Sequence, residues 1–281
     1  MKQSTVLTAL IILFVVPLAW TATAKASEAT EKNKAAFSQE HYDLLVKSSK
    51  EENDCTLWND WRKENPRVKI ELTKANLSKT SLGQANLSEA MLAEANLEMA
   101  DLWKANLEKS LLMRANLKQA FVGKANFQKA QLMFAHLEKI YTENAIFWEA
   151  NLEGAHLETA NLAEADFKGA HLLGAHLNSA NLWGVNLEGA NLSKANLTQA
   201  TLRNANLKGA NVQGASFMEA SLDGVCLESV DLTSAVHITV QQLSEAWTLY
   251  NAQLPPEMVK AFKEKYPEKY QKLIEKPKGQ N

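Results

Sequence analysis

Three histidines near the middle of this 281-residue chain share one spacing. His136, His156 and His176 lie twenty residues apart. Imidazole nitrogens are common ligands of Zn²⁺ and Cu²⁺, so three of them stacked on one surface could form a metal site. The simpler alternative is that each histidine only replaces another polar surface residue. The choice depends first on whether twenty residues make up one structural repeat.

A five-residue repeat positions these histidines. It covers residues 70–234, and Ala75-Asn76-Leu77 shows its pattern. Of its 33 pentads, 26 have alanine in the first position and 26 have leucine in the third. An α-helix turns through about 500° over five residues, so the leucines would spiral around it. A plain strand alternates every two residues and cannot keep the period either.

The period fits a β-solenoid instead. Three extended residues place alanine and leucine on one side and the middle residue on the other, and the last two residues turn a corner. Glycines such as Gly154 and Gly169 fall at these corners, where a positive φ is useful. Repetition coils the chain with alanine and leucine inside, and successive coils stack about 4.8 Å apart.

The repeat resembles the pentapeptide-repeat family, whose motif is A-(N/D)-L-x-x, over all of residues 70–234. The resemblance implies an all-β solenoid, a right-handed quadrilateral β-helix with four pentads in each coil. This chain would then form about eight coils, roughly 39 Å long at the spacing of adjacent strands. Twenty residues would make one coil, so the three histidines would stack on one outer face.

The third position of the pentads supports four sides. Phe127, Phe147 and Phe167 replace leucine there at a spacing of twenty. The smaller Val122 and Thr142 each precede a phenylalanine by one pentad, which conserves the volume of a packed layer. We therefore expect the three phenylalanine rings to stack inside the coil.

Residues 1–26 are typical of a secretory signal peptide. Lys2 precedes an apolar run from Val6 to Trp20, and alanines at 22, 24 and 26 offer A-x-A cleavage points. The run of about fifteen residues is short for a membrane span, and an uncleaved anchor is the alternative. We expect an exported protein, located in the periplasm, outside the cell or in a thylakoid lumen.

Residues 27–69 predict a helical N-terminal cap. Trp58 and Trp61 lie at the spacing of one helical face. They belong to the string W-N-x-W-R-x-x-N-P, which is similar to a lead-in found before some pentapeptide-repeat domains. The first coil of a solenoid exposes apolar side chains and unpaired backbone groups, which two tryptophans would cover.

Residues 235–281 predict a C-terminal cap followed by an amphipathic helix. Thr239 and Gln242 have the spacing of a capping box, which marks the start of a short helix. Pro267 must kink or split the later amphipathic helix. That last segment could dock on the coil or bind a partner.

Two groups of apolar residues occupy outward positions on opposite faces. We define the methionine patch as Met91, Leu111, Met113, Met133 and Phe134, and the aromatic column as Trp103, Phe121 and Tyr141. Clusters of apolar side chains on a regular surface suggest contact sites. Either a terminal segment folds over them or a partner protein binds them, and a homodimer stays open.

Charge and cysteine content limit further the classes of protein to which this chain could belong. The formal net charge is -2, and the repeat itself carries 18 acidic and 13 basic residues. Such a mixed balance does not indicate a nucleic-acid binder. Cys55 and Cys226 would be separated by most of the coil, too far apart for a disulfide.

The sequence contains no glycine-rich phosphate loop, no paired-cysteine zinc spacing and no G-x-S-x-G motif. We therefore predict a non-enzymatic protein without a cofactor, an exported interaction or structural module that binds an unknown protein and meets a membrane only through its signal peptide. The alternatives are a DNA-mimicking protector of a topoisomerase and a secreted effector. The first rests on the family resemblance, because some relatives mimic DNA and protect DNA gyrase. It requires a strongly acidic cytosolic rod.

Overall fold

The structure is a computed structural model that describes residues 37–51 and 55–277, all within one compact unit, Ala36–Asn281. The predicted signal peptide, residues 1–26, lies outside the described residues. Within the described part of the chain, no helix has the length and apolar character that a membrane span requires.

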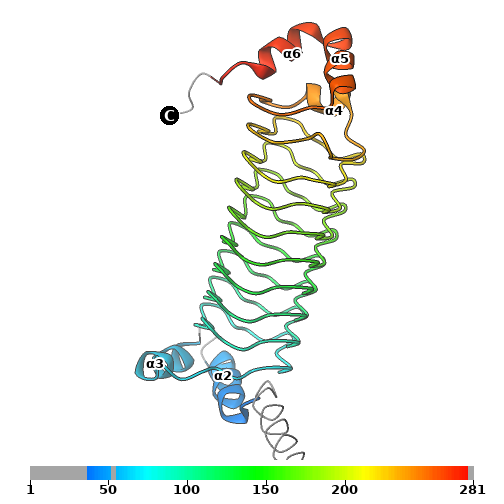
Figure 1. Cartoon of the computed structure of the whole chain (residues 1–281). Coiled ribbons are helices and arrows are strands. Elements are labelled where there is room, and N and C mark those ends of the chain that lie inside the picture. Colours follow the sequence, from blue (N-terminus) through cyan, green and yellow to red (C-terminus); the bar gives the residue numbers. More distant parts are fainter. Residues whose placement is uncertain (1–36, 52–54, 278–281) are drawn as a thin grey trace, which may run out of the picture. The chain divides into compact units, whose positions relative to one another are not determined.

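Parallel backbone bridges join residues twenty apart along the repeat, which forms a stack of coils (Figure 1). Glu71 pairs with Met91, and the same step recurs up to the pair of Ser216 and Val236. The pairing residue is the middle one of each pentad. Four pentads therefore make one turn, as the family resemblance implied.

The first and third positions of the pentads fill the interior. Alanine and leucine at these positions are almost fully buried. The ring centroids of Phe127 and Phe147 are 4.8 Å apart, those of Phe147 and Phe167 are 4.5 Å apart, and both pairs are parallel within 2°. The predicted phenylalanine stack is therefore present. The buried hydroxyl of Thr142 is satisfied because it donates to the carbonyl of Asn161 at 3.1 Å.

Each pentad ends in a tight turn. The backbone N–H of Ala75 donates to the carbonyl of Leu72 at 3.0 Å, and Lys74 between them has a φ of 60°. A positive φ at this place defines a type II turn. Every corner from 74 to 229 has a positive φ, so lysine, glutamate and glutamine adopt it as well as the predicted glycines.

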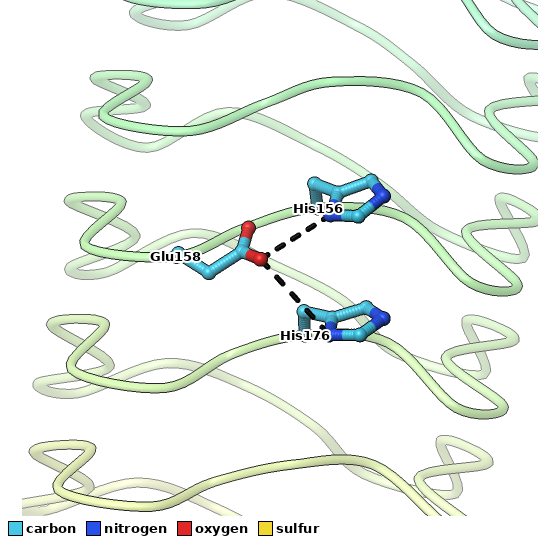
Figure 2. Close-up of side chains that lie close together, drawn as sticks. All are labelled: His156, Glu158 and His176. Atoms are coloured by element: carbon cyan, nitrogen blue, oxygen red, sulfur yellow. Dashed lines mark hydrogen bonds and ion pairs between the residues drawn. The ribbon is translucent and has the colours of Figure 1, made fainter.

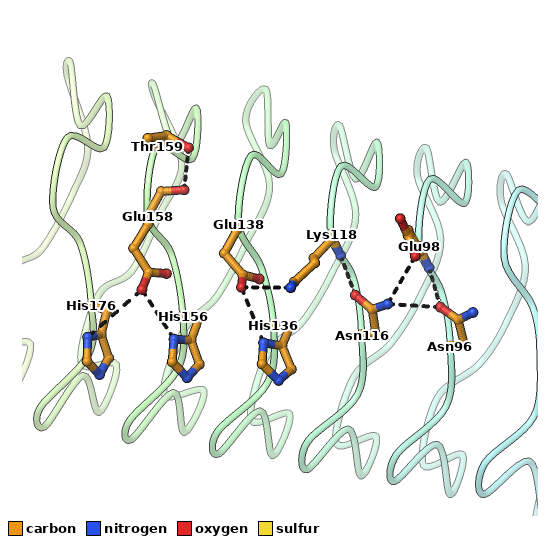
Figure 3. Close-up of polar contacts among 10 residues, drawn as sticks. All are labelled: Asn96, Glu98, Asn116, Lys118, His136, Glu138, His156, Glu158, Thr159 and His176. Atoms are coloured by element: carbon orange, nitrogen blue, oxygen red, sulfur yellow. Dashed lines mark hydrogen bonds and ion pairs between the residues drawn. The ribbon is translucent and has the colours of Figure 1, made fainter.

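The asparagine of the middle position makes two kinds of hydrogen bond. The Oδ1 of Asn116 accepts from the backbone N–H of Lys118 at 3.1 Å, a local turn that orders the corner. Its Nδ2 donates to the Oδ1 of Asn96, one coil earlier, at 3.1 Å (Figure 3). The A-N-L motif therefore combines a buried interior with a polar ladder outside.

Two helices cover the first coil, α2 (Gln39–Glu51) and α3 (Thr56–Glu64) (Figure 1). Trp58 is fully buried, and its indole N–H donates to the carbonyl of Asn86 at 2.9 Å. The ring of Trp61 lies 5.4 Å from that of Trp58 and is partly buried against the core. The two tryptophans therefore lie where the sequence placed them, against the exposed end of the repeat.

The backbone ladder continues past residue 234, the predicted end of the repeat. Cys226 pairs with Thr248 and Asp231 pairs with Gln253. Each step now spans twenty-two residues, because the chain between them contains α4 (Val240–Ser244), which begins with the predicted capping box at Thr239. The five-residue pattern ends before the coil does.

Two further helices, α5 (Pro256–Lys265) and α6 (Pro267–Ile274), are separated at Pro267 as predicted. The carbonyl of Leu273 accepts from the backbone N–H of Leu249 at 2.7 Å. The last helix therefore docks on the end of the coil, which selects one of the two options that the sequence left open.

Cys55 and Cys226 are both buried, and no disulfide joins them. Cys226 occupies the middle position of a pentad, which faces outward, but it is buried because the chain beyond residue 234 returns to pair with it through Thr248. Burial raises the pKa of the Cys226 thiol, so it is held in its neutral form.

Candidate functional site

The three histidines form a column on one outer face of the coil (Figure 3). The ring centroids of His136 and His156 are 4.9 Å apart, and those of His156 and His176 are 4.8 Å apart. The planes of neighbouring rings differ by 8° and 10°. Each histidine occupies the middle position of a pentad, where asparagine is usual, so the twenty-residue spacing does place the rings side by side.

Two glutamates complete the column, and sequence reasoning missed both. Glu158 Oε1 lies 3.2 Å from Nδ1 of His156 and 4.0 Å from Nδ1 of His176 (Figure 2). Glu138 Oε1 lies 3.3 Å from Nδ1 of His136. The signal was present as the tripeptide H-L-E, which occurs at 136–138 and again one coil later.

The glutamates divide the column into two groups. His156, Glu158 and His176 offer three ligand atoms that all lie within 4.8 Å of one another. Glu138 instead contacts the ammonium of Lys118 at 3.2 Å (Figure 3). That ammonium already supplies a positive charge beside His136. The structure therefore brings only two of the three predicted histidines into one candidate site, and adds a carboxylate to them.

The carboxylates of both glutamates are only partly satisfied. Glu138 Oε2 and Glu158 Oε2 are buried and have no hydrogen-bond partner. Burial by itself raises the pKa of Glu138, but hydrogen bonds from its own backbone N–H, Lys118 and His136 outweigh this effect and lower the pKa. Glu138 is therefore held as an anion.

The methionine patch is an outward surface on another face of the coil. Met91 and Leu111 are backbone-paired neighbours, and the side chains of Met113 and Phe134 are 37% and 45% exposed. Phe134 lies directly over Gly154 in the next coil, where an added Cβ would come within 2.5 Å of the ring. The patch is thus contiguous and open.

The aromatic column is more tightly packed against itself. The rings of Phe121 and Tyr141 stack at 5.4 Å, and Gly123 leaves room for Phe121 and Trp103 to approach each other. The ammonium of Lys104 lies 4.1 Å from the ring centroid of Trp103. These contacts engage part of the aromatic surface in this column, and Tyr141 is still 41% exposed.

Neither group lies beneath a described helix. The contacts of α2 and α3 with the repeat include the carbonyls of Asn76, Asn86 and Ser88, which belong to the first coil. The contacts of α4 and α6 lie at the other end of the coil, at residues 217–220 and 241–249. These helices therefore do not fold over the methionine patch or the aromatic column, which was one of the two explanations for the apolar groups.

The interior of the coil is dry, as a repeat filled by alanine and leucine predicts. The space between Phe167, Leu172 and Leu187 is too small to hold a water molecule. Open hollows occur instead on the outer surface, one of them beside Trp148 and Gly169 and two at the C-terminal end. One of about 530 Å³ lies between α6 and residues 244–248, and another of about 640 Å³ borders Cys226 and Trp247.

The fold described above defines a parallel β-helix built from five-residue units. Residues 70–108 and 143–233 match the family model described as pentapeptide repeats, in eight copies. The chain belongs to the pentapeptide-repeat family. A sequence search of curated proteins returned no match.

Several solved structures of pentapeptide-repeat proteins are similar to this chain. HetL of Nostoc sp. strain PCC 7120, a protein involved in heterocyst differentiation regulation, is 28% identical over 66% of this chain and 85% of HetL, with a TM-score of 0.27. A protein from the thylakoid lumen of Arabidopsis thaliana is 31% identical over 37% of this chain and 63% of its own, with a TM-score of 0.16. QnrB1, a plasmid-mediated fluoroquinolone resistance protein, is 17% identical over 63% and 84%, with a TM-score of 0.31. With TM-scores this low, the roles of these proteins are not transferred to this chain.

Proposed function

We propose that this chain is an exported, non-enzymatic module that binds another protein through the methionine patch. The observation that supports the proposal most directly is the exposure of Met113 and Phe134 on a surface where, from residue 153 onward, the same positions carry polar residues or glycine except at Leu173. Contiguous exposed apolar surface on a soluble coil is unfavourable unless it is covered in a complex.

The methionine patch suits a partner better than the aromatic column does. Methionine has a flexible, polarisable side chain that adapts to different apolar surfaces. The aromatic column is partly engaged already, through the stack of Phe121 on Tyr141 and the ammonium of Lys104. We expect the partner to present an apolar surface of its own, which could also come from a second copy of this chain.

Cross-coil ion pairs argue against the DNA-mimicking alternative. A DNA mimic needs an uninterrupted acidic surface, whereas lysines here pair with glutamates twenty residues later. These pairs are Lys74–Glu94 at 3.5 Å, Lys129–Glu149 at 3.5 Å, Lys168–Glu188 at 3.3 Å and Lys208–Glu228 at 3.0 Å. Alternating charges of this kind weaken the long-range field that would attract a DNA-binding enzyme.

A pair of variants tests the proposed surface. Leu111→Lys with Met113→Lys places two charges in the patch, and His171→Lys with Leu173→Lys places them at the same positions three coils later. In a cross-linking capture from the source cell, we expect the patch variant to lose a partner that the native protein and the control variant both retain. Unchanged capture by the patch variant would reject this surface.

The predicted export needs a separate test because residues 1–26 lie outside the described structure. Fractionation of the source cell should place the protein beyond the inner membrane, with a mass reduced by the signal peptide. Recovery of the full-length chain from the cytosol would contradict export. It would not contradict the proposed binding surface, which the capture experiment tests separately.

A further inference from the structure

We propose that His156, Glu158 and His176 bind one Zn²⁺ ion. The donor set is two imidazoles and one carboxylate, which is a common set for zinc in proteins. This site does not rest on the proposed binding of a protein partner, because the histidine column and the methionine patch occupy different faces of the coil.

The coil positions the three donors. His156 and His176 occupy equivalent positions in successive coils, so the backbone pairing between them sets the separation of their rings. Glu158 follows His156 by two residues, and its Oε1 lies near Nδ1 of both rings (Figure 2). All three donors therefore come from a regular scaffold that holds their Cα atoms in place.

The present separations allow a metal after small side-chain rotations. Zinc lies about 2.0–2.2 Å from its nitrogen and oxygen ligands, so the donors must approach one another more closely than the 4.8 Å that bounds them now. The side chains of His156, Glu158 and His176 are 34%, 28% and 46% exposed, which leaves them space to turn. Rotation about the bond to an imidazole or carboxylate group has a broad energy minimum.

The carboxylate of Glu158 differs from that of Glu138 in its ion pairs, because in the described part of the chain it contacts His156 and His176 but no lysine or arginine. Glu158 Oε2 is buried and has no hydrogen-bond partner, which is unfavourable for a carboxylate oxygen. A cation bound between Glu158 and the two histidines would compensate this charge. Glu138 Oε2 is likewise without a hydrogen-bond partner, but there Lys118 already neutralises the carboxylate.

His136 is not a ligand in this proposal. Its partner Glu138 already contacts the ammonium of Lys118 at 3.2 Å. A divalent cation placed there would be repelled by this ammonium at close range. The column thus contains one group neutralised by a lysine and one that is left for a metal.

Zinc would join two successive coils through their side chains. With three protein ligands, at least one coordination position stays open to water, as in zinc sites that are not purely structural. Protons compete with the metal for the imidazole nitrogens, so binding must weaken in acid.

Titration calorimetry with ZnCl₂ tests the site on the purified protein, without an affinity tag and after treatment with a chelator. We expect one Zn²⁺ per chain at pH 7.5 and at least tenfold weaker binding at pH 5.5. His156→Asn and Glu158→Gln should each weaken binding at least tenfold. Asparagine is the matched replacement because it occupies the same position in neighbouring coils, and thermal unfolding of each variant would verify that it is folded.

His136→Asn and His171→Asn serve as controls that leave the three donors intact. Both should bind Zn²⁺ with unchanged affinity. Absence of binding to the native protein would overturn the proposal, and so would equal binding by His156→Asn. Loss of binding in His136→Asn would also overturn it, because the site would then be the stacked histidine trio.

Discussion

Two stacks of three rings run along this coil with the same spacing, one inside and one outside. Phe127, Phe147 and Phe167 repeat at 4.8 and 4.5 Å in the interior. His136 and His156, and then His176, repeat at 4.9 and 4.8 Å on the surface. The backbone therefore sets the spacing of both stacks. The two stacks differ in their surroundings, which are close-packed and apolar for the phenylalanines and polar and partly exposed for the histidines.

The same ring spacing therefore serves packing in the interior of the coil and polar contacts on its surface. In the interior, each ring contributes packing, and its removal leaves a cavity that the coil cannot fill. On the surface, a ring contributes little packing but offers a nitrogen atom to a neighbour. Stability should therefore depend on the inner stack, and chemistry on the outer one.

The largest expected effect separates the two stacks directly. Phe147→Ala should lower the free energy of unfolding by about 3–5 kcal/mol, whereas His156→Ala should lower it by less than about 1 kcal/mol. Urea unfolding followed by tryptophan fluorescence measures both. Phe147→Leu, which restores the usual residue of this position, should recover most of the loss. Similar losses for the two alanine variants would remove the distinction.

Two glycine corners of the coil, Gly154 and Gly174, test in the same way how the surroundings of a residue determine its contribution to stability. Gly154 and Gly174 have φ values of 61° and 64°, but only Gly154 lies under a ring, that of Phe134. Alanine at either position costs about 1–2 kcal/mol for the left-handed conformation. Gly154→Ala should cost additional stability because Phe134 must move, and thermal unfolding should rank it below Gly174→Ala. The reverse order would show that Phe134 does not rest on this corner.

The smallest expected effect concerns charge in the outer column. Burial alone would raise the pKa of Glu138, but hydrogen bonds from its own backbone, Lys118 and His136 lower it from its ordinary value of 4.5. A lowered pKa in the folded state stabilises the protein above the unfolded pKa, and this contribution is lost as the pH falls through the folded one. Acid unfolding between pH 5 and pH 3 should be less steep in Glu138→Gln. The phenylalanine stack has no titratable group, so Phe147→Leu should leave the slope unchanged.

Much of the architecture could be predicted from the sequence because a five-residue period restricts the backbone strongly. The phenylalanine stack, the tryptophans of the first cap and the split at Pro267 all follow from spacing and local chemistry. These features depend on which residue types can occupy a buried or terminal position, and the sequence states those types directly.

The remaining features depend on contacts that a period does not contain. Glu158 reaches His156 and His176 because its side chain bends along the surface, which is decided by its neighbours in space. The burial of Cys226 follows from a return of the chain through Thr248, after the pentad pattern has ended. Positive φ at lysine and glutamate corners is likewise imposed by the coil, against the preference of those residues.

The most direct test of the central geometry is a pair of engineered disulfides on the outer surface. Thr201 and Ser221 are backbone-paired across successive coils. Ser216 precedes Ser221 by one pentad, so it lies on the neighbouring face of the coil and does not pair with Thr201. Parallel neighbours have Cα atoms about 4.8 Å apart, within the range of a disulfide. Thr201→Cys with Ser221→Cys should oxidise rapidly to an intramolecular disulfide, and Thr201→Cys with Ser216→Cys should stay reduced under the same conditions. Faster oxidation of the second pair would contradict a coil of twenty residues, and with it the placement of both ring stacks.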